Sequence, residues 1–168
     1  MFANLTHATL RFIAFFNHLM ILASSAIVTG LVSWFLHKYD YRGVNIVYQE
    51  VIATITLGFW LVGAVLPLVG KYRGHLAPLN LIFSYLWLTS FIFSSQDWSS
   101  GKCSFGQPGE GHCARKKAID AFNFIAFFFL LCNTLVELIL LRAEYATSAA
   151  AAPHNKELSA GRPSDATV

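Results

Sequence analysis

The feature that most constrains this chain is its division into four long apolar runs separated by short polar segments. The runs cover residues 12–36, 46–69, 76–95 and 118–141. A membrane-spanning helix needs about 20 predominantly apolar residues to cross a hydrocarbon core roughly 30 Å thick, and each run meets that length. We therefore predict an all-α integral membrane four-helix bundle, in which residues 1–145 form one domain with four transmembrane helices.

The charge content agrees with a membrane environment. Only 12% of the 168 residues are charged and 55% are hydrophobic, whereas a soluble domain carries about 25% charged residues. The net charge of +3 comes from basic residues scattered over every loop. Because they form no single block, we expect no nucleic acid as a partner.

The two ends of the chain differ from the spans. The first run is longer than the roughly 7 to 15 apolar residues of a cleaved signal peptide, so we expect it to be retained as an anchor. After Tyr145 the sequence becomes an alanine-rich stretch followed by Pro153 and mostly small, polar residues. Such a segment has too little apolar surface to fold alone. We predict a short disordered cytosolic tail over residues 146–168.

The longest predicted loop, residues 95–117, contains Cys103 and Cys113 among several glycines. Because glycine lets the chain turn back easily, we expect these two cysteines to form a disulfide. Two free loop thiols are the alternative.

The sidedness of the bundle cannot be taken from charge. Four spans place both termini on one side, and the basic residues divide equally: Arg11, Lys71, Arg73, Arg142, Lys156 and Arg162 against Lys38, Arg42, Lys102, Arg115, Lys116 and Lys117. The positive-inside rule therefore gives no orientation. Disulfides persist outside the cytosol, so the cysteine loop predicts cytosolic termini and a plasma-membrane or secretory-pathway protein.

Several polar residues fall inside the predicted spans. The candidates for helix packing are His18, Ser25, Thr29 and Ser33 on the first span, and Asp120, Asn123, Thr134 and Glu137 on the fourth. Each set lies on one side of its helix and should face the bundle interior, because polar groups are costly in lipid. The small residues at four-residue spacing on the first span favour close contact with another helix, preferably the fourth. A proton or ion path through His18, Asp120 and Glu137 is the alternative.

No catalytic or metal-binding motif accompanies these residues. The sequence contains no CxxC, HxxxH or HExxH spacing and no Gly-rich phosphate loop, which are the patterns that metal and nucleotide sites use. A haem held by two histidines needs both deep in facing helices, and only His18 lies that deep. Cys132, in the middle of the fourth span, is expected to be an inert packing residue. We expect no enzymatic activity, no metal and no cofactor.

The cysteine loop runs directly into the phenylalanine-rich fourth span through Cys113-Ala114-Arg115-Lys116-Lys117-Ala118. With a short first loop and a tight basic turn over residues 70–75, this arrangement resembles the fungal branch of the MARVEL-domain membrane proteins. The closest match covers residues 103–137, and the general pattern extends to Tyr145. The segment 83–87 is similar in aromatic richness but lacks an acidic residue that many fungal members carry there.

What the resemblance implies is a non-enzymatic, membrane-organising role in lateral membrane domain formation, membrane apposition or vesicle trafficking. Its partners would be membrane lipids and other membrane proteins, in a homo- or hetero-oligomer. The polar residues of the first and fourth spans leave a second class of function open, namely a small transporter or channel subunit.

Overall fold

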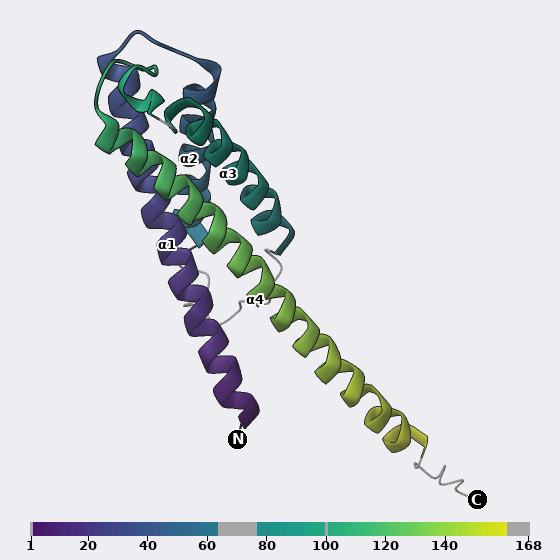
Figure 1. Ribbon diagram of the computed structural model, residues 1–168. Coiled ribbons are helices and arrows are strands. Elements are labelled where there is room, and N and C mark those ends of the chain that lie inside the picture. The colour runs from purple at the N-terminus through teal and green to yellow at the C-terminus, as the bar shows by residue number, and fades with distance from the viewer. Residues whose placement is uncertain (1, 64–76, 100, 161–168) are drawn as a thin grey trace, which may run out of the picture.

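Four long helices make up the regular structure of the computed structural model, which describes residues 2–63, 77–99 and 101–160 (Figure 1). They are α1 (Phe2–Lys38), α2 (Val44–Gly63), α3 (Ala77–Trp98) and α4 (Cys113–Ala160), with a short 3-10 helix, η2 (Lys102–Ser104), between the last two. The described residues contain no strand. The predicted all-α, four-helix fold is therefore confirmed.

Each helix contains a segment long and apolar enough to cross a membrane. These segments are Phe12–Lys38, Val44–Val62, Ala77–Trp98 and Cys113–Arg142. They agree with the four predicted spans, and they make the chain an integral membrane protein. Residues 64–76 lie outside the described part of the chain, so the end of the second predicted span and the basic turn at 70–75 are not described here.

The fourth helix is longer than predicted at both ends. It begins at Cys113 instead of residue 118, because the His112 carbonyl accepts the backbone N–H groups of Arg115 and Lys116 and forms a first turn ahead of the apolar run. It then continues through the alanine-rich stretch to Ala160, the first part of the predicted tail. Alanine has the highest helix propensity, and extending an existing helix needs no new nucleus. Residues 161–168 lie outside the described residues.

The start of α1 and the end of α4 lie at the same end of the molecule, as an even number of spans requires (Figure 1). The opposite end carries the short connection from α1 to α2 and the cysteine loop from α3 to α4. We call these the terminal end and the loop end. At the loop end the Asn45 amide of α2 donates to the Asp97 carboxylate of α3 at 3.0 Å. In the bundle, α4 packs against both α1 and α3.

The bundle has apolar side chains on its outside as well as in its core. Phe12 and Val62 are 71% and 72% exposed, and many other large apolar side chains face outward. By contrast, Gln49, Asn80 and Asn123 are almost completely buried. This distribution suits a lipid environment, in which apolar groups can face outward and polar groups must find partners inside.

A buried tryptophan links α3 to α2 inside the bundle. Trp87 of α3 is completely buried, and its indole Nε1 donates to Thr56 Oγ1 of α2 at 3.0 Å. The Thr56 hydroxyl in turn donates to the Ile52 carbonyl at 2.7 Å. The Thr56 hydroxyl thus accepts a hydrogen bond from α3 and donates one to a backbone carbonyl of its own helix. Together the two bonds hold α2 against α3.

We predict that Trp87 and Thr56 are energetically coupled. In a double-mutant cycle of Trp87→Phe and Thr56→Val, the coupling in the free energy of unfolding should be roughly 0.5 to 1.5 kcal/mol, the range for interhelical hydrogen bonds in membranes. Thr54→Val is the matched control, because among the described residues the Thr54 hydroxyl donates only to carbonyls of its own helix. Unfolding in mixed micelles measures the cycle, and additive effects would contradict the prediction.

Candidate functional site

A disulfide closes the loop between α3 and α4. Cys103 lies in η2 and Cys113 is the first residue of α4, and their Cα atoms are 5.4 Å apart. This separation lies within the range that disulfides span. The predicted Cys103–Cys113 pair is confirmed, while Cys132 is a free cysteine, partly buried on α4.

A buried lysine ammonium holds the same loop from within. Lys116 has no exposed surface. Its Nζ donates to three backbone carbonyls, those of Cys103 at 3.1 Å, Gly106 at 2.6 Å and Gly109 at 2.8 Å. A buried charge is tolerated when hydrogen bonds replace its water, and the three bonds match the three donors of an ammonium. Sequence analysis counted Lys116 only as a loop charge and missed this role.

The loop also folds back on the end of α3. The Trp98 indole donates to the Gln107 carbonyl at 2.9 Å. A Cβ at Gly106 would lie 2.9 Å from the Asp97 carbonyl oxygen and 3.0 Å from that of Lys102, so this close approach requires glycine. The loop is therefore a compact cap on the bundle.

Aromatic and basic side chains gather beside this cap. The Trp34 ring of α1 lies 4.8 Å from the Lys38 ammonium and 3.8 Å from the Arg115 guanidinium carbon, and its centroid is 5.3 Å from that of His112. The Arg115 cation–π contact joins the first turn of α4 to the end of α1, whereas Lys38 belongs to α1 itself. Desolvation lowers the pKa of His112, and the positive charges of Lys38 and Arg115 lower it further. His112 is thus held toward its neutral form.

A first polar cluster lies within the bundle near the loop end. Asn123 Nδ2 of α4 contacts Gln49 Oε1 of α2 at 3.3 Å and Ser94 Oγ of α3 at 3.3 Å. One turn earlier on α4, Asp120 Oδ1 accepts from the hydroxyls of Ser94 at 2.5 Å and Ser95 at 2.9 Å. These side chains join three helices, so the polar face predicted on α4 does point inward here.

A second polar cluster lies further along α4, beside the start of α3. Glu137 has no exposed surface, and its Oε1 accepts from Asn80 Nδ2 of α3 at 2.9 Å and Asn133 Nδ2 at 3.3 Å. Thr134, on the same predicted face, is buried and donates to the Leu130 carbonyl of its own helix. Of these partners, Asn80 and Asn133 were not among the sequence-predicted residues.

The polar residues predicted on one face of α1 have different surroundings. His18 is buried, with its ring centroid 6.2 Å from that of Trp60 of α2. Ser25 donates to the Leu22 carbonyl of its own helix, and the Thr29 hydroxyl oxygen is buried with no hydrogen-bond partner among the described residues. Ser33 donates to Glu50 of α2. The hydrogen bond that Ser33 forms thus joins this ladder to α2, and the packing of the ladder against α4 stays a prediction.

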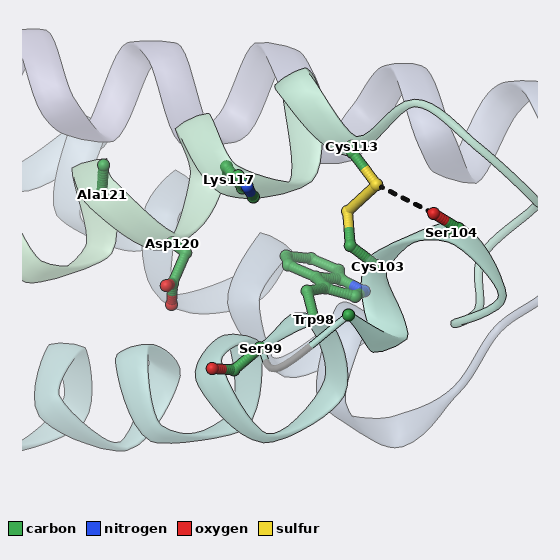
Figure 2. Close-up of a pocket in the computed structure, with 9 residues that line it drawn as sticks. Trp98, Ser99, Cys103, Ser104, Cys113, Lys117, Asp120 and Ala121 are labelled. Carbon is green, nitrogen blue, oxygen red and sulfur yellow. Dashed lines mark hydrogen bonds between the residues drawn. A yellow bond between two sulfur atoms is a disulfide. The ribbon is translucent and has the colours of Figure 1, made fainter.

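A pocket of about 600 Å³ opens between the end of α3, the disulfide and the first turns of α4 (Figure 2). Its lining includes Trp98, the last residue of α3, and Ser99, which follows it. Lys117 and Asp120 line the pocket from α4. In Figure 2 the Asp120 carboxylate projects from α4 toward α3. The pocket therefore contains charges of both signs, which sequence analysis did not bring together.

The described residues form no metal-binding cluster, and the sequence has no match among known proteins. Within the described residues, no group of three His, Cys, Asp or Glu side chains is placed to hold a metal ion. The sequence matches no protein-family model and no curated protein.

We predict that Lys116 is the main non-covalent support of the disulfide loop. Lys116→Met keeps a long unbranched side chain but leaves three carbonyls without their donor, at a cost of roughly 1 to 3 kcal/mol. The Cys103–Cys113 disulfide should then be reduced faster by a water-soluble thiol, as followed by mass spectrometry. Lys102→Met, at an exposed position of the same loop, is the control. Equal reduction rates for Lys116→Met and the unmodified protein would contradict this role.

Proposed function

We propose that this chain is a non-enzymatic membrane-organising protein that acts in lateral membrane domain formation, membrane apposition or vesicle trafficking. The observation that carries the proposal is that its buried polar side chains bond between helices. Asn123 joins α4 to α2 and α3, and Glu137 joins α4 to α3. Polar groups used in this way stabilise helix packing, which is the ordinary role of amides and hydroxyls in membrane bundles.

The resemblance to fungal MARVEL-domain proteins supports the same proposal. It is strongest over residues 103–137, which include the disulfide, the inward-pointing Lys116 and the phenylalanine-rich part of α4. A compact extramembrane cap on a four-helix bundle offers surfaces to lipids and neighbouring proteins, as an organising protein needs. Its expected partners are membrane lipids and other membrane proteins, in homo- or hetero-oligomers.

Sidedness is part of the proposal. Because disulfides persist in oxidising compartments, the loop end faces away from the cytosol and both termini are cytosolic. A chain in that orientation belongs to the plasma membrane or the secretory pathway. Charge does not contribute, since the basic residues are equally divided between the two sides.

The orientation predicts how the loop cysteines react in intact cells that display the protein at the surface. After mild reduction, a membrane-impermeant maleimide should label Cys103 and Cys113, whereas a C-terminal epitope should be detected only after permeabilisation. A Cys103→Ser, Cys113→Ser double variant is the control, because Cys132 lies within the span of α4. Epitope detection without permeabilisation, or labelling only after it, would reverse the orientation.

A transporter or channel subunit is the second candidate, favoured by one specific observation. Glu137 is a completely buried carboxylate within the membrane-spanning part of α4, and two amide groups donate to it. Ionisable residues at such positions often mark ion or proton paths. With Asp120 nearer the loop end, α4 carries two acidic residues along one side.

Two measurements separate these functions. An organising protein should show a patchy distribution in the membrane, its deletion should disturb membrane domains, and vesicles containing it should be no more permeable to protons or Na⁺ than empty vesicles. A transporter should give flux that Glu137→Gln abolishes without changing localisation, whereas the exposed Asp40→Asn control should keep it. Uniform distribution together with Glu137-dependent flux would overturn the proposed role.

A further inference from the structure

The pocket beside the disulfide lies where two membrane-spanning segments end. Its lining includes Trp98, the last residue of the α3 span, and Cys113, the first residue of the α4 span. The ends of membrane spans mark the boundary between hydrocarbon and headgroups, where tryptophan is enriched. A polar pocket at this level can receive a headgroup whose acyl chains remain in the bilayer.

The carboxylate in this pocket is fixed in position and still able to accept a hydrogen bond. Asp120 Oδ1 takes the hydroxyls of Ser94 and Ser95. No hydrogen bond is formed by Asp120 Oδ2 among the described residues. Asp120 is half-buried and lines the pocket, so Oδ2 is an available acceptor for a cationic N–H group.

A positive charge lies one helical turn away. Lys117 is exposed, lines the same pocket, and forms no ion pair with any described residue. Side chains three positions apart on a helix have Cβ atoms about 5 to 6 Å apart. The pocket therefore presents an ammonium and a carboxylate at neighbouring positions, and neither is neutralised by the other.

The α4 surface next to the pocket is apolar. Phe124 lies one turn beyond Asp120, is 46% exposed, and has its ring centroid 5.4 Å from that of Phe91 of α3. Residues four apart on a helix share a face. An amphiphile with its headgroup at Asp120 can thus lay its acyl chains over these rings.

We propose that this pocket binds the headgroup of an ethanolamine phospholipid, with the phosphate at Lys117 and the ammonium at Asp120. A choline headgroup is a poorer ligand, because its quaternary nitrogen has no N–H group to donate to Asp120. A glycerol headgroup lacks the positive charge. The inference goes beyond the proposed organising role and does not depend on it, since a transporter could bind the same lipid.

The test measures lipid binding to the full chain with its disulfide intact. The protein in nanodiscs or detergent is titrated with ethanolamine, choline and glycerol phospholipids of identical acyl chains, and bound lipid is counted by native mass spectrometry. We expect about tenfold tighter binding of the ethanolamine lipid, the effect of one hydrogen bond to a charged group. Equal affinities for the three lipids would overturn the proposal.

Two variants assign the charges. Asp120→Asn should abolish the preference for ethanolamine over choline, and it keeps an oxygen for the two serine hydroxyls. Lys117→Gln should weaken both lipids equally through their shared phosphate. The controls are Glu110→Gln and Lys102→Gln, which remove exposed charges of the same loop outside this pocket. Intact mass and thermal unfolding show whether each variant keeps its disulfide and fold.

The variants and a soluble competitor can each overturn the assignment. If folded Asp120→Asn keeps the ethanolamine preference, the ammonium is not bound at Asp120. Glycerophosphoethanolamine carries the same phosphodiester and ammonium charges without acyl chains. If it binds as tightly as the lipid, the ligand is a soluble phosphate ester and the lipid assignment fails. Neither result bears on the imaging and flux measurements, so the proposed function is judged separately.

Discussion

Hydrogen bonding between polar side chains in a medium without water is the constraint on which this bundle depends. In a bilayer, apolar side chains gain little by exchanging lipid for one another, so close packing and interhelical hydrogen bonds decide how helices meet. Asn123 contacts side chains of α2 and α3 from α4, and Trp87 donates from α3 to α2. Each such bond forms only when its helix has a particular orientation about its own axis. The bonds therefore determine which helix faces meet.

The loop end applies the same rule to a full charge. The Lys116 ammonium is buried and is satisfied by three carbonyls that a folded loop must bring to it. The Cys103–Cys113 disulfide holds that loop covalently. The loop that forms one wall of the pocket beside the disulfide is thus held in two ways, by the disulfide and by Lys116. A preformed wall reduces the ordering that a ligand must impose on binding.

Asp120 and Glu137 lie toward opposite ends of the membrane-spanning segment of α4 and have different surroundings. Asp120 is half-buried beside a pocket that opens at the end of a span, where a headgroup can reach it. Glu137 is completely buried between amide groups of α3 and α4. The first position is suited to binding from the membrane surface, whereas the second contributes to the interior of the bundle. A shared face on a helical wheel therefore does not imply a shared role.

The sequence by itself determined the four spans, the common side of the two termini and the Cys103–Cys113 pair, because apolar length and the proximity of two loop cysteines are local properties of the chain. It also placed Asn123 and Glu137 toward the interior, since helical periodicity decides which residues share a face. Only the tertiary structure decided that Ser33 meets Glu50 of α2, that Lys116 points into the loop, and that Lys117 and Asp120 share a pocket. Those contacts depend on how the helices are oriented relative to one another and on how a glycine-rich loop folds back. No local sequence pattern predicts either of these.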